Sequence, residues 1–291
     1  MTARKLDGNA AAAEIKAELV GRIARLAERG VTPGLGTLLV GDDGPSAKYV
    51  AMKHDDCTEL GIASVGVTLG DDATMTDLDA IIDQFNADDT IHACLLQYPF
   101  PSHLAYEPVL LRLDPAKDAD GLHPVNLGRL VMGIDAPLAC TPAGIVELLV
   151  RNGVEIAGRH VVIIGRGLTI GRPLANLVAL KRPNANAAVT VVHTGVPDIG
   201  VYTRTADIVV AAAGAPGLLT ADMVKPGAAV VAAGVTFVDG KVVSDVADDV
   251  AEVAGWLSPR IGGVGPMTRA LLMANTVAAA ERHAGISATA A

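Results

Sequence analysis

The stretch Val161-Val-Ile-Ile-Gly165-Arg-Gly167-Leu-Thr-Ile-Gly171 decides the fold of the second half of the chain. Its four successive apolar residues predict a buried strand, and the glycines after them predict a tight turn into a helix. A dinucleotide pyrophosphate requires this arrangement, because glycines let the backbone approach and a helix start offers free N–H groups. The spacing is one residue longer than the usual GxGxxG pattern. We favour nucleotide binding, with a plain connecting turn as the alternative.

The next predicted strand, over 189–193, bears on the choice of cofactor. Domains selective for NAD usually carry an acidic residue at the end of this strand, for the ribose 2′-hydroxyl. Here the strand ends in Val192-His193-Thr194, without an acid. Arg166 and Thr194 are therefore candidate contacts for a 2′-phosphate, with a solvated loop charge and a helix cap as their respective alternatives. The pattern favours NADP over NAD.

Strand and helix patterns alternate outward from this stretch, which predicts an α/β fold with parallel sheets. In the first half, apolar spacing predicts helices over 9–29, 46–60 and 77–86, with strands over 35–40, 62–68 and 91–97. Ser46 is the expected cap of the second helix. The proline-rich stretch 98–124 is predicted to hold turns, short helices and functional loops.

The second half repeats the alternation. Thr141 is the expected cap of a helix with Pro142 at its first position, and strands are predicted over 160–164, 189–193, 208–211 and 229–232. A helix follows from Pro266, at the end of the glycine loop. We predict a first domain over 1–140, a Rossmann-like domain over 141–265, and a C-terminal helix over 266–291 that returns to the first domain.

The composition limits the classes of function. The chain has 291 residues, a net charge of −9 and 51% hydrophobic residues, which exclude disorder and argue against nucleic-acid or anionic-membrane surfaces. No apolar segment reaches signal-peptide or membrane-span length, so we expect a cytoplasmic protein. Cys57, Cys94 and Cys140 lack CxxC spacing and are expected to be buried free thiols. We expect no metal site.

Four side chains of the first half are candidates for chemistry. Tyr49 and Lys53 are four residues apart and share one helix face, so both can point at one site, although surface snorkelling is the alternative for such a pair. Gln97 is the last residue of the predicted apolar strand 91–97, at the end where parallel sheets bind ligands; an ordinary turn amide is its alternative. Asp120 lies in the loop Lys117-Asp-Ala-Asp-Gly121, which forms either an Asx turn or, with Asn126, a clamp for a donor-rich heterocycle.

The stretch Gly262-Gly-Val-Gly-Pro-Met-Thr268 is a dense glycine loop that leads into a helix. Flexible linkers are usually rich in serine and are not followed by a helix. We therefore expect a site-forming loop, with a planar ligand against its backbone.

Six motifs occur in one order along the chain. They are Ser46-x-x-Tyr49-Val-x-x-Lys53, Gln97-Tyr-Pro-Phe-Pro101, Lys117-Asp-Ala-Asp120-Gly121 with Asn126, Cys140-Thr-Pro-x-Gly144, Gly165-Arg-Gly with Gly171-x-Pro173, and Gly262-Gly-Val-Gly-Pro-Met-Thr268. This order resembles the bifunctional methylenetetrahydrofolate dehydrogenase/methenyltetrahydrofolate cyclohydrolase (FolD-type) family. The resemblance covers nearly the whole chain, from about Leu6 to the C-terminal helix.

The resemblance implies two α/β domains flanking a cleft, with folate bound by the first and NADP by the second. It also implies NADP-dependent oxidation of 5,10-methylenetetrahydrofolate, followed by hydrolysis to 10-formyltetrahydrofolate. Lys53 would be the central catalytic group, tuned by Gln97; Tyr49 would shape the folate site or stack on the folate, and Asp120 would hold its pterin-like ring. The substrate would also contact Gly262, Gly263 and Pro266, and the cofactor would contact Thr141, Gly165, Arg166, Gly167, Gly171, Thr194 and Val235.

Further implications are a homodimer and a role in the one-carbon metabolism that serves purine, histidine and methionine biosynthesis. The chain departs from the family pattern at Gly167, where many members have Ser, at Ala232-Ala233, and at Arg260-Ile261. His54, His123 and His193 are expected to be structural or solvent-facing. The alternatives are an NADP-linked dehydrogenase without cyclohydrolase activity, a related dehydrogenase for a small hydroxy acid or shikimate-like substrate, and an inactive nucleotide-binding paralogue.

Overall fold

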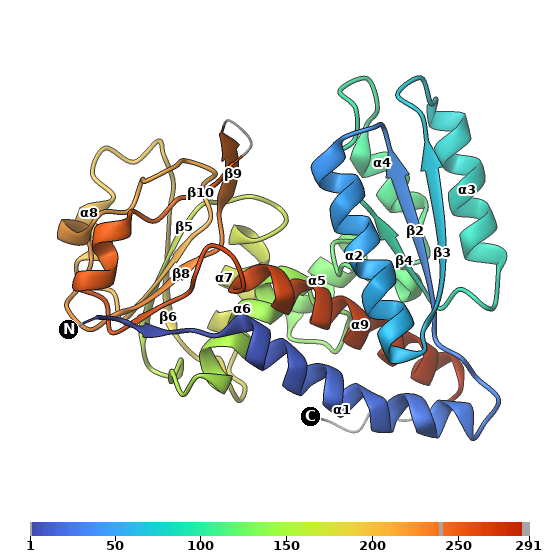
Figure 1. Cartoon of the computed structure of the whole chain (residues 1–291), viewed down its shortest axis with the longest axis horizontal. Coiled ribbons are helices and arrows are strands. Elements are labelled where there is room, and N and C mark those ends of the chain that lie inside the picture. Colours follow the sequence, from blue (N-terminus) through green and yellow to red (C-terminus); the bar gives the residue numbers. More distant parts are fainter. Residues whose placement is uncertain (1, 239–240, 287–291) are drawn as a thin grey trace. The chain divides into compact units, whose positions relative to one another are not determined.

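The computed structural model describes residues 2–238 and 241–286, which divide into two compact α/β units (Figure 1). Within the described residues, unit 1 comprises 2–13, 130–134 and 141–268, and unit 2 comprises 14–129, 135–140 and 269–286. Helix α1 (Gly8–Ala27) and helix α9 (Val264–His283) each begin in unit 1 and continue into unit 2.

Unit 2 is built on a three-stranded parallel sheet in the order β3-β2-β4. The strands are β2 (Gly34–Val40), β3 (Ala63–Leu69) and β4 (Ala93–Leu96), connected by α2 (Gly44–Leu60) and α3 (Met75–Ala87). The alternation of the sequence thus predicts these five elements correctly. The predicted cap of α2 is wrong: the Asp43 carboxylate caps the helix by accepting the Ser46 amide at 2.9 Å. The helix starts earlier than predicted because Pro45 fits its first turn.

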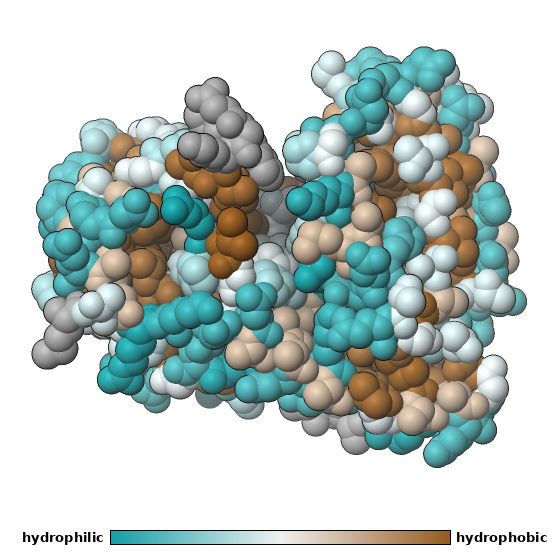
Figure 2. Space-filling view, viewed as in Figure 1, coloured by the Kyte–Doolittle hydropathy of each residue, from teal (hydrophilic) through white to brown (hydrophobic). Residues whose placement is uncertain are grey.

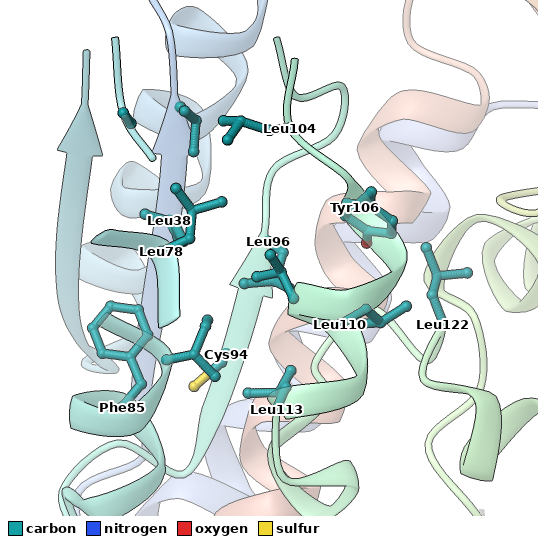
Figure 3. Packing of buried hydrophobic residues seen from close by; sticks show 14 of the residues in the cluster. Leu38, Leu78, Phe85, Cys94, Leu96, Leu104, Tyr106, Leu110, Leu113 and Leu122 are labelled. Carbon is teal, nitrogen blue, oxygen red and sulfur yellow. The ribbon is translucent and has the colours of Figure 1, made fainter. Parts of the chain in front are cut away.

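The core of unit 2 lies between this sheet and α3 and α4 (Tyr106–Arg112), as Figure 3 shows. Every residue of β2 is buried, because the strand is central in the sheet. Leu38 of β2 and Leu96 of β4 are register partners, and Phe85 of α3 is fully buried against the same cluster. Helix α4 and a short 3₁₀ helix, η1 (Pro115–Lys117), lie in the predicted loop region 98–124, and α5 (Pro124–Met132) begins at its last residue.

The part of α9 that belongs to unit 2 packs on this domain, as the sequence predicts. The Cys57 thiol lies 3.6 Å from the Met273 sulfur, and the Asn275 side chain donates to the carbonyls of Ala119 (2.9 Å) and Leu138 (3.0 Å). Arg22 of α1 forms two hydrogen bonds with Glu281 of α9, at 3.0 and 2.6 Å. These contacts make the C-terminal helix an integral layer of unit 2.

Unit 1 contains a six-stranded parallel sheet in the order β1-β11-β8-β7-β5-β6. Its strands are β1 (Arg4–Lys5), β11 (Trp256–Leu257), β8 (Ala229–Ala232), β7 (Ile208–Ala211), β5 (His160–Ile164) and β6 (Ala188–Val192). Its other elements are α6 (Cys140–Arg151), α7 (Gly171–Ala179), α8 (Gly200–Thr203), η2 (Ala221–Met223), η3 (Asp248–Glu252), and the hairpin strands β9 (Val235–Val238) and β10 (Lys241–Ser244).

Two features of unit 1 differ from the sequence prediction. Thr141 is not a cap, because α6 already begins at Cys140, and its hydroxyl lies 3.1 Å from that of Thr268. Pro266 is the third residue of α9 rather than the first.

Strands β1 and β11 have only two residues each, too few for a recognisable pattern, yet their pairing adds residues 4 and 5 to this sheet. The Arg4 guanidinium lies 5.1 Å from the Trp256 ring centroid.

The surface in Figure 2 shows hydrophilic and hydrophobic residues interspersed over the viewed face of each unit. Among the helices that the structure describes, none has the length and apolar character needed to cross a membrane.

The ion pair between Arg22 and Glu281 yields a stability prediction. Replacing Arg22 with Met leaves the Glu281 carboxylate, 3% exposed, without its two donors. We expect a loss of about 2 kcal/mol in the free energy of unfolding, less than the roughly 3–5 kcal/mol typical of fully buried pairs, because the Arg22 side chain is 27% exposed. Urea unfolding followed by far-ultraviolet circular dichroism measures the loss.

The matched control is Arg159→Met, which removes an exposed (i, i+4) pair with Glu155. It should change the free energy by less than about 0.5 kcal/mol. Equal effects of the two substitutions would contradict a structural role of the buried pair.

Candidate functional site

The amine of Lys53 is the centre of a polar cluster in unit 2. Lys53 is only 4% exposed, and its Nζ donates to Oε1 of Gln97 at 2.8 Å. The same Nζ lies 4.5 Å from the ring centroid of Tyr49, one helical turn earlier on α2. Gln97 directly follows β4, so the carboxyl edge of the sheet places its side chain opposite α2. The structure therefore brings together three residues predicted from the sequence.

The orientation of the Gln97 amide is fixed by a second hydrogen bond. Its Nε2 donates to the carbonyl of Tyr98 at 2.8 Å, so that Oε1 is the atom turned toward Lys53. The hydrogen-bond acceptor of the lysine is thus a neutral amide, which gives an ammonium less stabilisation than a carboxylate would. Burial consequently lowers the pKa of Lys53 from 10.5 to about 8.

Asp120 is the ionisable partner of Lys53 in this cluster. Burial raises the pKa of Asp120 to about 6, and the charge of Lys53 opposes that shift. In return, the charge of Asp120 raises the pKa of Lys53, while the nearby Arg269 lowers it. Between about pH 6 and 8 the cluster therefore holds an aspartate carboxylate and a lysine that is close to releasing its proton.

Asp118 organises the loop that carries Asp120. Its buried carboxylate accepts the amides of Gly121 (3.0 Å) and His123 (2.8 Å) and the Nδ2 of Asn126 (2.9 Å). The Asx-turn alternative is therefore right for Asp118. Asn126 is 0% exposed and its Nδ2 also donates to the Pro115 carbonyl, so it is a structural residue and cannot clamp a ligand.

Two residues near this loop are not among the predicted site residues. Cys140 donates through Sγ to the Ala119 carbonyl at 3.2 Å, and Asn275 of α9 donates to the same carbonyl. Both therefore fix the peptide that precedes Asp120. Burial holds the pKa of the Cys140 thiol well above its usual value. Cys140 belongs to one of the quoted motifs, whereas a single amide on the mainly apolar α9 gives no sequence signal.

The three cysteines are free and buried, as predicted. Burial raises the pKa of Cys57 to about 12, and that of Cys94 likewise to about 12. Both therefore stay thiols at neutral pH.

The glycine turn of unit 1 joins three elements backbone to backbone. Gly165 has φ +129°, and a Cβ there would lie 2.0 Å from the carbonyl oxygen of Ala212, after β7. A Cβ on Gly171 would lie 2.2 Å from the carbonyl oxygen of Gly165. These two glycines are required for packing. Gly167 is exposed, and a Cβ on it would meet nothing within 4 Å.

At the start of α7 the amides of Arg172 and Leu174 donate to the carbonyls of Gly167 and Ile170, and Pro173 has no N–H, so Gly171 is the residue of this first turn whose amide can face a ligand. The residue before the helix, Ile170, provides no side-chain cap, and Arg166 and Gly167 are exposed beside it. An uncapped helix start next to open space fits the pyrophosphate of a dinucleotide. The observed geometry is thus compatible with the nucleotide alternative of the sequence analysis.

The two residues predicted to contact a 2′-phosphate come shortly after two adjacent strands, at the same edge of the sheet. Ile164 of β5 pairs with Val192 of β6, and Arg166 and Thr194 follow two residues later, both exposed. Thr194 does not cap a helix, because α8 begins only at Gly200. Val235, the first residue of β9, is 45% exposed and follows β8 at that edge.

The glycine loop before α9 packs against the start of α1. A Cβ on Gly8 would lie 1.8 Å from the carbonyl oxygen of Gly263, and a Cβ on Gly263 would lie 2.4 Å from that of Pro259. Gly262 has φ +79° and abuts the Asn9 side chain. Packing inside unit 1 thus already requires both glycines. Open space lies instead beside Gly265, next to the half-buried Pro266.

Family models match both parts of the chain. Residues 6–120 match the model described as "Tetrahydrofolate dehydrogenase/cyclohydrolase, catalytic domain", and residues 139–284 match "Tetrahydrofolate dehydrogenase/cyclohydrolase, NAD(P)-binding domain".

Similar proteins cover almost the whole chain. The "Bifunctional protein FolD" of Syntrophotalea carbinolica is 50% identical over 284 residues, 98% of each chain. The solved bifunctional FolD enzyme of Campylobacter jejuni is 40% identical with a TM-score of 0.91, covering 95% of this chain and 98% of its own. The Trypanosoma brucei methylenetetrahydrofolate dehydrogenase-cyclohydrolase, solved with NADP and an inhibitor, is 38% identical with a TM-score of 0.91, covering 97% and 98%.

The electrostatics of Lys53 give a direct prediction. A titration of the protein labelled with ¹³C at the lysine Cε, with the Lys53 resonance assigned from Lys53→Met, should yield a pKa of about 8. Asp120→Asn should lower this pKa further, because it removes a negative charge that stabilises the ammonium.

Asp55→Asn is the control for this titration. Asp55 lies on the same helix but is exposed and does not shift Lys53. A Lys53 pKa near 10.5, or equal effects of the two substitutions, would disprove this account of the cluster.

Proposed function

Because this chain belongs to the tetrahydrofolate dehydrogenase/cyclohydrolase family, we propose that it oxidises 5,10-methylenetetrahydrofolate with NADP and hydrolyses the resulting 5,10-methenyltetrahydrofolate to 10-formyltetrahydrofolate. The observation that carries this proposal is the buried Lys53, held by Gln97 and Tyr49, in the part of the chain that matches the family's catalytic domain. We assign folate binding to the predicted domain 1–140 and NADP binding to 141–265.

Hydrolysis requires a base of the strength that Lys53 has. Water adds to the methenyl carbon, and one of its protons must leave as the new C–O bond forms. Neutral Lys53 accepts that proton. The bond between the carbon and N5 then breaks, N5 takes up a proton as the hydroxyl becomes the formyl oxygen, and the proton on Lys53 passes to solvent. With a pKa of about 8, Lys53 can both accept and release a proton near neutral pH.

Tyr49, Gln97 and Asp120 support this chemistry. The Gln97 carbonyl oxygen holds the Lys53 amine in one place, and the Tyr49 ring borders it, with an apolar face suited to an aromatic ring of the folate. The Asp120 carboxylate can accept hydrogen bonds from the donor-rich pterin. We keep Gly262, Gly263 and Pro266 of unit 1 as proposed substrate contacts.

Oxidation depends on alignment more than on acid or base. Bound NADP supplies a nicotinamide that accepts a hydride from the methylene carbon. The flanking nitrogens of the folate stabilise the resulting cation, so the residues of the chain need only hold the reacting atoms about 3–3.5 Å apart. Lys53 is therefore less important for this step than for hydrolysis.

The carboxyl edge of the unit 1 sheet would hold NADP. The turn of Gly165, Arg166, Gly167 and Gly171 and the start of α7 would take the pyrophosphate, and Arg166 with Thr194 would take the 2′-phosphate. Thr141 and Val235 are further proposed contacts. A structural relative that is 38% identical was solved with NADP. Gly167 leaves space where a serine hydroxyl would otherwise stand.

We extend the proposal to the cellular setting on the strength of the family resemblance. The protein would act in the cytoplasm as a homodimer and supply one-carbon units for purine, histidine and methionine biosynthesis.

Lys53→Met separates the two activities. Cyclohydrolase activity should fall by at least about 10²-fold, because the substitution removes the proton acceptor, whereas hydride transfer should stay measurable. Absorbance of methenyltetrahydrofolate measures the first activity and reduction of NADP the second. The matched control is Lys48→Met on the exposed side of α2, which should leave both unchanged. Equal turnover of the methenyl substrate by Lys53→Met and the unaltered protein would refute the assignment.

The hydrolysis rate should rise with pH through about 8 and level off above it, because only neutral Lys53 accepts the proton. Initial rates between pH 6.5 and 9.5, extrapolated to zero time to correct for spontaneous hydrolysis, measure this profile. A rate that is flat over this range would argue against Lys53 as the base.

Arg166→Met tests the cofactor assignment. We expect KM for NADP to rise about tenfold or more and KM for NAD to change little, since only NADP carries the 2′-phosphate. Arg159→Met, at the opposite edge of the same sheet, is the control. If Arg166→Met raised both KM values equally, Arg166 would not be the 2′-phosphate ligand.

A further inference from the structure

Asp245 is a fully buried carboxylate in unit 1 that the proposed function does not use. It directly follows β10 and is 0% exposed. Its Oδ2 accepts the backbone amides of Ala213 at 2.7 Å and Gly214 at 2.9 Å. Its Oδ1 has no hydrogen-bond partner, and within the described residues the carboxylate has no ion-pair partner.

The position of the Asp245 carboxylate also explains why residue 234, in the turn after β8, is a glycine. A Cβ on Gly234 would lie 1.9 Å from Asp245 Oδ2, so only glycine leaves room for the carboxylate. The Asp245 amide donates to the Gly234 carbonyl at 3.2 Å. One residue thus joins the two turns: the Asp245 side chain binds the turn 212–214 after β7, and its backbone amide binds Gly234 in the turn after β8.

The topology places these turns beside the glycine turn. The carbonyl oxygen of Ala212, next to the residues that Asp245 holds, is the atom that Gly165 closely approaches. In the sheet order, β6 lies on one side of β5, and β7 followed by β8 lie on the other. All of these strands are parallel, so their carboxyl ends share one edge.

The direction of a dinucleotide along this edge follows from that order. With the 2′-phosphate beside β6 and the pyrophosphate at β5, the nicotinamide end extends toward the turns after β7 and β8. Those are the turns that Asp245 joins. An oxidised nicotinamide ring carries a positive charge that the reduced ring lacks, so a buried anion that holds these turns would distinguish the two forms.

The two oxygens of the Asp245 carboxylate have different surroundings. Oδ2 accepts two backbone N–H groups, whereas Oδ1 is buried without a hydrogen-bond partner among the described residues. A charge on this carboxylate acts strongly at short range, because the side chain is 0% exposed and the protein interior has a low effective dielectric constant.

We propose that Asp245 is a positioning residue of the cofactor site, which fixes the turns after β7 and β8 and whose buried charge favours oxidised over reduced cofactor. This inference rests on the proposed binding of NADP to unit 1. Because Asp245 is fully buried, it acts through the turns and through its field and does not contact the cofactor.

Asp245→Asn tests the charge. The amide oxygen can still accept both N–H groups, and the side chain keeps its shape. Its Nδ2 takes the place of Oδ1, which has no partner, and this affects both cofactor forms alike, so the ratio of the two Kd values reports the charge. We expect the Kd of oxidised NADP to rise about three- to tenfold and that of reduced NADP to change less than about twofold. Isothermal titration calorimetry of the full chain with each form measures both constants. An unchanged ratio of the two Kd values would overturn the charge preference.

Asp245→Ala tests the positioning. It leaves the amides of Ala213 and Gly214 unsatisfied, so the affinity for both cofactor forms should fall at least about tenfold. Hydrolysis of methenyltetrahydrofolate needs no cofactor and shows whether the variant is still folded. A folded Asp245→Ala variant that binds both forms as tightly as the unaltered protein would overturn the positioning role.

Asp118→Asn is the matched control, because Asp118 is a buried carboxylate of unit 2 that also accepts two backbone amides. It should leave the ratio of the two Kd values unchanged, and a shift equal to that of Asp245→Asn would overturn the inference. If the unaltered protein bound neither form of NADP, the proposed function itself would fail, which is a different result from an unchanged ratio.

Discussion

The low pKa of Lys53 depends on a hydrogen-bond acceptor that carries no charge, the side-chain carbonyl oxygen of Gln97. A carboxylate in that place would form a buried ion pair and keep the lysine protonated. Several elements of unit 2 position the groups that make this contact. The central strand β2 and its neighbour β4 place Gln97, helix α2 places Lys53 and Tyr49, and the Tyr98 carbonyl fixes the orientation of the amide. The charge of the neighbouring Asp120 raises the pKa of Lys53, but Gln97 and not Asp120 accepts the hydrogen bond of the amine.

A different constraint organises unit 1, where backbone segments approach too closely for side chains. Gly165 against Ala212, Gly171 against Gly165 and Gly8 against Gly263 each exclude a Cβ. Close approach brings the ends of the parallel strands and the start of α7 to one compact edge. The glycines that look alike in the sequence therefore have different roles, since Gly167 has open space around it and the others do not.

Much of this arrangement is predictable from the sequence, for physical reasons. The buried strands β5, β7 and β8 are short unbroken apolar runs, and the helices carry clear spacing, so both appear in the residues alone. The four-residue separation of Tyr49 and Lys53 already places them on one helix face. The proximity of Gln97 follows from the rule that parallel strands end at one edge.

What the sequence does not reveal depends on contacts between distant residues. Strands β1 and β11 are two residues long and are defined by pairing alone, β11 with β8 and β1 with β11. Asp118 and Asp120 have the same side chain two positions apart, and only the folded loop assigns one to structure and leaves the other beside Lys53. Asp245 comes after the separate two-stranded hairpin of β9 and β10, and nothing in its neighbours along the chain indicates that it holds the amides of Ala213 and Gly214.

The pairing of β1 with β11 has a practical consequence for spectroscopy. Trp256 is the only tryptophan of the chain, it lies in β11, and the Arg4 guanidinium of β1 lies over its ring. Intrinsic tryptophan emission is therefore a signal from a single site, the strand next to the β1 edge of the six-stranded sheet. It should report the detachment of β1, which would remove the Arg4 guanidinium from the Trp256 ring.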